Sequence, residues 1–312
     1  MRSFAVGLSV IAVALLVLLP APVAKAQGSA IQIAPTILEF TVAAGGVFEI
    51  DEVGIFNPSL NEPQRMEILV QDLEVIDEHG TYAFVSDSTT RYSISKWVST
   101  APVEVKLNPQ EHQGLRVKVE VPPDAEPGGH YGVILANAFP ESAERLGESE
   151  GVRVLAIGGV GTVLLATVPG PMSWDGEVLE FLPVPFVNLG PVQFRIRFAN
   201  RGTIHYSPYG YIDIYDWFGS RVARVDIEPQ RVFPEKVRQL EAEWKRVLLI
   251  GKYRAVATVF YGQNGESSGT ATTEFWAFPY RPALALLAVL VALLVVAKLR
   301  RKVLESWEEG GG

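Results

Sequence analysis

The sequence predicts an all-β fold of two β-sandwiches in series, with an N-terminal signal helix and one C-terminal transmembrane helix. Apolar segments stand at both ends of the 312 residues, and helical periodicity is almost absent between them. Instead, apolar and polar residues alternate along short segments that are separated by Pro, Gly and Asn turns. This pattern is typical of antiparallel sandwiches.

Residues 1–26 have the parts of a secretory signal peptide. A basic residue precedes an apolar run at 10–19, and Ala24 and Ala26 supply the small side chains of a cleavage site. We therefore expect the mature chain to begin near Gln27. An uncleaved anchor helix is the alternative, and two prolines between the run and the cleavage site disfavour it.

The first sandwich is predicted over residues 27–169. Leu115–Val121 alternates apolar and charged residues without a break, as in a strand with one solvated face. The nearly all-apolar run Val152–Val168 contains glycines and an arginine, so we interpret it as two strands joined by a glycine bend, or as one long buried strand. The stiff Pro169-Gly170-Pro171 segment is predicted to end this domain.

The second sandwich is predicted over residues 170–279. Phe194–Phe198 and Tyr211–Tyr215 alternate as strands do, and residues 216–219 are predicted to form a turn after the latter. These strands and their turns complete the all-β assignment.

The two halves share an ordered set of turn motifs. Asn tolerates a left-handed backbone and bonds its own backbone in turns. A Tyr just after a Gly turn can bury its ring and bond an upstream backbone group, as in a tyrosine corner. The pattern predicts two Ig-like sandwiches, and both an old duplication and a chance match stay open. The matching segments are Phe56-Asn57-Pro58, Leu107-Asn108-Pro109-Gln110-Glu111 and Gly129-His130-Tyr131, then Phe198-Ala199-Asn200-Arg201, Val232-Phe233-Pro234-Glu235 and Gly251-Lys252-Tyr253.

A transmembrane helix is predicted over residues 282–298, because 283–297 holds only Ala, Leu and Val. At about 1.5 Å per residue this run spans about 22 Å, so flanking groups must extend it across a hydrocarbon core of about 30 Å. The basic cluster after it marks the cytoplasmic side, and 299–312 becomes a short basic and acidic tail. A buried core helix is the disfavoured alternative. The predicted membrane anchors are Trp276, Tyr280, Lys298, Arg300, Arg301 and Lys302.

Composition excludes several classes of function. The chain has no cysteine, which excludes disulfides, thiolate metal sites and a cysteine nucleophile. Its net charge of −8 becomes more negative without the two ends, and it opposes binding to nucleic acid or to anionic wall polymers through bulk electrostatics. We expect no nucleic-acid partner.

No catalytic constellation and no cofactor motif stands out, so we expect neither enzymatic activity nor a cofactor. The histidines lack metal-ligand spacing and are predicted to be turn or surface residues: His79, His112, His130 and His205. Two acidic sets could supply oxygens to calcium, but neither has a known loop pattern. These sets are Asp72, Asp77 and Glu78, and Asp213 and Asp216.

Aromatic residues of the second sandwich are the better candidates for recognition. Tyr206, Tyr209 and Trp217 stand in a short segment rich in aromatics. Exposed aromatic rings can stack on sugars or anchor a protein partner. The alternative is that these rings cover the end of the sandwich.

The first domain resembles the domain at the start of WxL-interacting proteins of Gram-positive bacteria, which is itself similar to the Ig-like domains of pilus chaperones. The order of signal, domain, second β-domain, membrane helix and short basic tail also matches. The resemblance implies a peptidoglycan-binding first domain and a host-binding second domain, but it assigns no binding residue. The residues that carry it are Ile33-Ala34-Pro35, Phe56-Asn57-Pro58, Trp97, Leu107-Asn108-Pro109 and the segment 121–134.

We therefore expect a single-pass membrane protein with both sandwiches outside the cell and the C-terminus in the cytoplasm. Its expected role is adhesion or scaffolding, and its expected partners are a cell-wall polymer or a secreted surface protein, with membrane lipid around the helix. The alternative is a membrane-tethered assembly chaperone that donates a strand edge to surface subunits. Pilus chaperones, however, work free in the periplasm and usually place basic residues in the cleft between domains. A wall enzyme is the third possibility.

Overall fold

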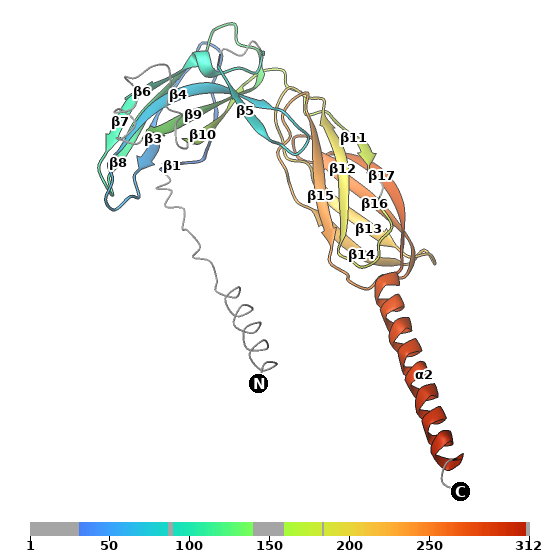
Figure 1. The fold of residues 1–312 in the computed structure, drawn as a ribbon. Coiled ribbons are helices and arrows are strands. Elements are labelled where there is room, and N and C mark those ends of the chain that lie inside the picture. Colours follow the sequence, from blue (N-terminus) through green and yellow to red (C-terminus); the bar gives the residue numbers. More distant parts are fainter. Residues whose placement is uncertain (1–30, 87–89, 140–158, 183, 310–312) are drawn as a thin grey trace, which may run out of the picture.

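The computed structural model describes residues 31–86, 90–139, 159–182 and 184–309. Its strands form two Ig-like β-sandwiches in series, and a long apolar helix follows the second (Figure 1). The predicted all-β fold class is therefore confirmed. The predicted signal peptide, residues 1–26, lies outside the described residues.

The first sandwich encloses one core between a four-stranded and a six-stranded sheet. Alternation explains the burial along its strands: Leu115, Val117 and Val119 are buried, whereas Arg116 is exposed between them. A short 3-10 helix, η1 (Ser95–Trp97), precedes β6. The four-stranded sheet has the order β1 (Gln32–Ala34), β3 (Val47–Phe56), β8 (His112–Glu120), β6 (Val98–Ala101). The six-stranded sheet has the order β2 (Ile37–Thr41), β10 (Gly159–Val168), β9 (Gly128–Phe139), β4 (Gln64–Val75), β5 (Tyr82–Val85), with β7 (Glu104–Leu107) also paired to β4.

The second sandwich packs a three-stranded sheet against a four-stranded sheet around a separate core. Phe194, Ile196 and Phe198 of one β12 face are all buried in it. The three-stranded sheet has the order β11 (Gly176–Phe181), β12 (Val192–Asn200), β15 (Val237–Trp244). The four-stranded sheet has the order β14 (Arg221–Ile227), β13 (Tyr209–Tyr215), β16 (Gly251–Tyr261), β17 (Ser267–Ala277).

Among the described residues one helix, α2 (Tyr280–Glu309), has the length and composition of a membrane span. Its apolar part, Tyr280–Leu299, has a mean hydropathy of 2.6, and none of it is buried. The helix continues to Glu309, so most of the predicted tail, from residue 299 onward, is helical. Pro282 lies in the first turn, where a proline removes no helical hydrogen bond, and no Gly or Pro follows it before Gly310.

The predicted Asn turns are built in the same way in both sandwiches. In the first, Asn57 donates its backbone N–H to the Glu111 carbonyl (2.9 Å), and the Gln110 N–H donates to the Asn57 carbonyl (2.9 Å). Asn57 is completely buried, and its side-chain amide bonds carbonyls on both turns. The positive φ of Gln110, 62°, lets this turn fold back onto Asn57.

The second sandwich repeats these contacts through Asn200. The Asn200 N–H donates to the Lys236 carbonyl (3.0 Å), and the Glu235 N–H donates to the Asn200 carbonyl (3.0 Å). Glu235 has a φ of 59°, so it matches the unusual backbone of Gln110. The shared turn pattern of the two halves is therefore a shared hydrogen-bond geometry.

The predicted tyrosine corner is confirmed in one sandwich and wrong in the other. The Tyr253 hydroxyl donates to the Ile250 carbonyl (3.2 Å), a backbone group just upstream. The Tyr131 hydroxyl instead contacts His205 of the second sandwich. This end of the first sandwich packs against the second sandwich, and His205 of the second sandwich provides the partner of the Tyr131 hydroxyl.

Candidate functional site

The two sandwiches meet in an apolar contact centred on Phe233, in the turn between β14 and β15. Its side chain is only 5% exposed. The ring packs edge-on against Tyr131 (centroids 4.6 Å apart) and Tyr82 (5.8 Å), both of the first sandwich. Leu73, Val75 and Leu165 complete this cluster. The second sandwich thus packs one aromatic side chain against a face of the six-stranded sheet of the first.

A buried polar network lies beside Phe233. The His205 backbone N–H donates to the Tyr131 hydroxyl oxygen (3.0 Å), and His205 Nδ1 lies 3.1 Å from the same oxygen. His205 Nε2 lies 3.3 Å from Glu39 Oε1. These partners assign a neutral imidazole that donates from Nε2 to Glu39 and accepts the Tyr131 hydroxyl proton at Nδ1. Burial lowers the pKa of His205, and the neighbouring Glu39 carboxylate only partly offsets this.

Charged pairs surround this contact on both sides. The β4–β5 turn of the first sandwich reaches β12 and β15, where Arg197 donates to Glu78 through Nε (2.8 Å) and a second nitrogen (2.5 Å). These bonds lower the pKa of Glu78. The Gln239 N–H donates to the Glu78 carbonyl (2.7 Å), which fixes the turn against β15. Arg231 lies 3.6 Å from Glu39.

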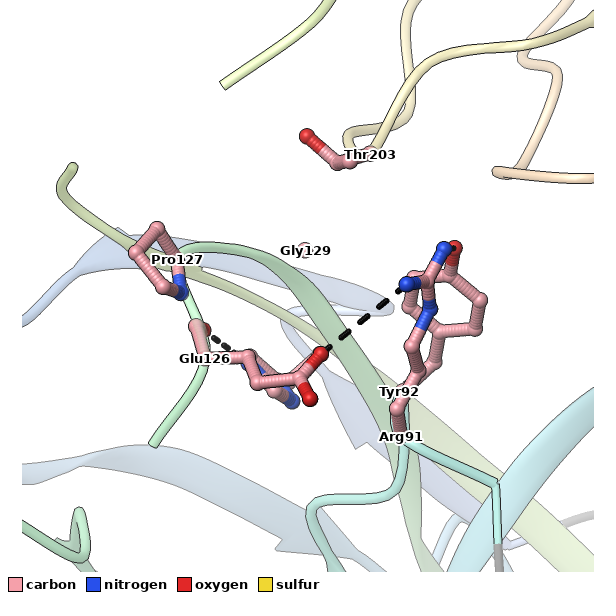
Figure 2. A pocket seen from close by; sticks show the side chains of 7 residues that line it. Arg91, Tyr92, Glu126, Pro127, Gly129 and Thr203 are labelled. Atoms are coloured by element: carbon pink, nitrogen blue, oxygen red, sulfur yellow. Dashed lines mark hydrogen bonds and ion pairs between the residues drawn. The ribbon is translucent and has the colours of Figure 1, made fainter. Parts of the chain in front are cut away.

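A small pocket lies at the other edge of the junction (Figure 2). Arg91 and Tyr92 form one wall, Glu126 faces Arg91, and Thr203 closes the pocket from the second sandwich. Arg91 pairs with Glu235 across the junction and lies 4.0 Å from Glu126. The pocket has a volume of about 30 Å³, which suits a water molecule, whereas ligand pockets measure roughly 300–1,000 Å³. This pocket is therefore too small for a ligand, and the contacts of the junction serve to hold the two sandwiches together.

A larger, open concavity lies on the first sandwich, at the sheet that faces away from this joint. It has a volume of about 450 Å³, and its lining includes Pro102, Leu115 and the exposed ion pair of Arg116 with Asp51 (3.3 Å). A β-bulge between Ile50 and Val53 forms its rim. Its volume falls within the range of roughly 300–1,000 Å³ that is typical of ligand sites. Sequence reasoning did not single it out, because a bulge becomes visible only once the strand register is known.

All four histidines were predicted to be turn or surface residues, and for two of them this prediction is wrong. His130 and His205 are 3% and 7% exposed, whereas His79 and His112 are exposed. Desolvation lowers the pKa of His130, whose Nε2 lies 3.0 Å from the Glu126 carbonyl oxygen. His130 of the first sandwich and His205 of the second both lie where the two sandwiches meet, which explains their burial.

The acidic sets considered for calcium have protein partners instead. Asp72 is buried and accepts hydrogen bonds from the backbone of Ile94 (2.9 Å) and Ser95 (2.8 Å). Asp213 accepts two hydrogen bonds from Arg224 (2.8 and 2.7 Å). Within the described ranges, no group of three or more His, Asp or Glu side chains is arranged to hold a metal ion.

The predicted recognition aromatics do not form one site. Tyr206 is half-buried against Phe198 at the junction end, and its hydroxyl donates to the Asp175 carbonyl (2.7 Å). Tyr209 and Trp217 flank opposite ends of β13 and are 45% and 68% exposed. Tyr206 therefore has the covering role that was the alternative, and the other two rings stay accessible.

The predicted membrane anchors lie at the base of α2 and along it. Trp276 and Tyr280 are 57% and 40% exposed. Lys298 follows near the end of the apolar part. The side chains of Arg300, Arg301 and Lys302 lie outside the described part of the helix.

Known proteins resemble this chain in fold only. No protein-family model and no curated protein sequence matches it. Solved structures with a similar fold include the class 5 fimbriae chaperone CfaA, at 14% identity, with a TM-score of 0.39 over 78% of this chain and 98% of that one. The Escherichia coli chaperone DraB is 14% identical, with a TM-score of 0.35 over 80% and 97% of the two chains. The Salmonella enterica chaperone SafB, solved in complex with the SafA pilin, is 12% identical, with a TM-score of 0.36 over 81% and 98%.

The described part of the chain consists of two Ig-like sandwiches in series, followed by α2. The finer resemblance to WxL-interacting proteins has no sequence match to support it and stays a prediction.

Proposed function

We propose that this protein is a non-enzymatic binding or scaffold protein anchored in the membrane by α2, with both sandwiches outside the cell. The first, membrane-distal sandwich would engage cell-wall peptidoglycan or a secreted surface protein. The observation that carries this proposal is the position of α2. It follows β17 after two residues, and every residue of its 20-residue apolar part is exposed.

The length of α2 fits a membrane. At about 1.5 Å per residue, Tyr280–Leu299 spans about 30 Å, the thickness of a hydrocarbon core. A soluble protein would hide such a surface in its core, since exposed apolar area costs free energy in water. The basic residues after the span favour a cytoplasmic C-terminus.

Anchoring is tested with the full chain by alkaline extraction of membranes. The variant is Leu290→Arg/Val291→Arg, because each arginine at the centre of a span costs about 2.5–3.5 kcal/mol. The matched control is Leu60→Arg, at a leucine that is 77% exposed on the first sandwich. We expect native protein and control to stay with the membrane pellet and the helix variant to leave it. Extraction of the native chain into the soluble fraction would contradict the proposal.

Wall binding is tested by sedimentation of the detergent-solubilised full chain with purified peptidoglycan at physiological salt. The concavity at Asp51 and Arg116 offers the sharpest variant, Arg116→Glu, and Arg254→Glu on the second sandwich is the charge-matched control. Saturable sedimentation that only the first variant weakens would support binding at this concavity. Without sedimentation, the proposed partner becomes a secreted protein.

One observation favours the assembly-chaperone alternative. On its outer edge β10 pairs with β2 only from Val163 onward, so Gly159–Thr162 has no strand partner there among the described residues. An unpaired edge can accept a strand from another protein. Against this role, the junction arginines Arg91, Arg197 and Arg231 all have carboxylate partners and are not free for a subunit.

This alternative predicts that amide hydrogen exchange at Gly159 and Gly161 slows when a secreted subunit copurifies with the full chain. Copurification with unchanged exchange at these residues would contradict strand donation.

A further inference from the structure

Exposed apolar side chains gather at the end of the second sandwich from which α2 leaves. The strand register brings four segments to this end: the described residues of 182–191 (182 and 184–191) after β11, 216–220 after β13, 245–250 after β15, and 276–280 at the end of β17. Figure 1 shows α2 leaving from this end, beyond the β13 and β14 labels. We call the exposed apolar side chains of these four segments the collar.

Two of the collar segments carry the most exposed side chains. Trp217 and Phe218 are 68% and 80% exposed at the tip of the β13–β14 turn. Val247, Leu248 and Ile250 are 61%, 57% and 62% exposed. Single exposed apolar residues are common, but a group of this size at one end of a domain marks an interaction surface.

The 182–191 segment is fixed against the base of the helix. The Val187 N–H donates to the Trp276 carbonyl (2.9 Å), and the Phe278 N–H donates to the Val187 carbonyl (2.9 Å). The ring of Phe186, which is 57% exposed, lies 6.1 Å from the ring of Tyr280. This segment of the collar therefore lies at the level where α2 begins.

A backbone contact joins the 245–250 segment to this base. The Gly190 N–H donates to the Val247 carbonyl (2.9 Å), which links 182–191 to 245–250. Gly251 pairs with Ala277 in antiparallel register, so the residues just before it lie beside those that follow β17. Tyr215 pairs with Arg254, which places the 216–220 turn at the same end. The four collar segments thus lie together at the end of the sandwich where α2 begins.

The opposite end of the same sandwich is different. Its loop at 262–266 reads Gly-Gln-Asn-Gly-Glu, and Phe233 in the other turn is buried in the junction. Apolar exposure in the loops is therefore a property of the end that carries the helix.

We propose that the collar inserts into the interfacial layer of the bilayer crossed by α2, so that its partner is phospholipid. This inference rests on the proposed membrane anchoring. Trp, Tyr and Phe favour the membrane interface, and apolar side chains held at its level bury in the boundary between headgroups and acyl chains. Exposed Lys245 and Arg246 flank the collar and suit lipid phosphates.

The collar therefore gives the second sandwich a second contact with the membrane, in addition to α2. A helix alone leaves the sandwich free to tilt, whereas a collar around its base fixes the axis of the sandwich relative to the membrane. Because the junction holds the first sandwich against the second, this seating also fixes the height of the first sandwich above the bilayer.

The test measures the membrane depth of spin labels on the full chain in vesicles of phosphatidylcholine and phosphatidylglycerol. The chain has no cysteine, so each introduced cysteine is unique. The collar variants are Phe218→Cys and Leu248→Cys, Gln263→Cys reports the opposite end of the sandwich, and Leu290→Cys reports the centre of α2. We expect the ratio of oxygen to nickel-chelate collisions at positions 218 and 248 to exceed that at 263 severalfold.

Each outcome separates the two proposals. A lipid-exposed label at 290 with water-exposed labels at 218 and 248 overturns the collar inference and leaves the anchoring intact. Water exposure at 290 overturns the anchoring itself. Labels at 218 that are shielded from both reagents and broaden each other's spectra indicate a second copy as the partner, which also overturns the lipid assignment.

Discussion

A single side chain, Phe233, couples the two sandwiches. It is 5% exposed and fills a site lined by Tyr82, Tyr131 and Leu165, so its truncation leaves a cavity between the sandwiches. Truncating a buried Phe costs about 3–5 kcal/mol in a domain core. We expect Phe233→Ala to lower the free energy of unfolding and to split one cooperative transition into two.

The measurement is denaturant unfolding of the detergent-solubilised full chain, followed by scanning calorimetry. Phe218→Ala is the matched control, since that ring is 80% exposed. An unchanged single transition in Phe233→Ala would show that the junction contributes nothing to stability.

His205 makes the same junction sensitive to acid. Burial lowers its pKa below the ordinary value of about 6.5, so the folded state favours neutral imidazole more than the unfolded state does. The resulting stability is complete above about pH 6.5 and is lost as pH falls through the lowered pKa. The charged groups that face the ring are Glu39 and Arg231, and the Tyr131 hydroxyl contacts it.

We expect the free energy of unfolding to fall between about pH 7 and pH 5, and less steeply in His205→Gln. His130 also has a lowered pKa, so His130→Gln is the comparison that isolates the contribution of His205. Equal slopes in the native chain and His205→Gln would contradict a role for His205.

At the scale of single elements, the Asn turns hold each sandwich closed. Asn200 is completely buried, and its side chain donates to the Ile204 and Val232 carbonyls (both 2.9 Å) and accepts from the Gly202 N–H (2.8 Å). Alanine leaves these groups unsatisfied, at a cost of about 1–3 kcal/mol for a buried polar group. We expect Asn200→Ala and Asn57→Ala each to destabilise mainly their own sandwich.

Hydrogen exchange resolved by peptide measures this effect. The control is Asn264→Ala, at an exposed loop residue of the second sandwich. Uniform loss of protection across both sandwiches after either substitution would mean that they unfold as one unit.

The predictable elements were those whose signal is local. Leu115, Val117 and Val119 alternate with polar residues, and alternation alone places them inside a strand pair. Asn57 and Asn200 were visible as turn residues, since their bonding partners include nearby backbone. By contrast, Val247 and Leu248 stand in an apolar run that local pattern cannot distinguish from a buried strand.

The junction was not predictable for a related reason. Tyr131 and His205 meet across 74 residues, and no periodicity reports a contact at that separation. The corner expected at Tyr131 was a sound local inference, but it assumed that this end of the sandwich faces solvent. Likewise, the sequence draws attention to Trp217, which is 68% exposed, yet its neighbours in the collar come from three other segments.

At the scale of the whole molecule, the two sandwiches and α2 form a bent arrangement (Figure 1). Phe233 fills the centre of the bend, the β4–β5 turn with Glu78 supports one side, and Arg91 with Glu235 supports another. Gly80 in the β4–β5 turn has a φ of +79°, and a side chain there would overlap Arg238 of the second sandwich. Such close contact at several points predicts one preferred angle between the sandwiches.

Double electron–electron resonance between spin labels at Leu60→Cys and Thr270→Cys, with the protein in nanodiscs, tests that angle by measuring the distance between the labels. We expect a narrow distribution in the otherwise native chain. Glu78→Lys should broaden and shift it, because the new cation faces Arg197 and Arg238 where an ion pair stood. Glu104→Lys, which breaks an exposed ion pair with Arg65 inside the first sandwich, is the charge-matched control and should leave the distribution narrow. If the native chain gives a broad distribution, the sandwiches are flexibly linked, and only the second is held at a fixed height above the membrane.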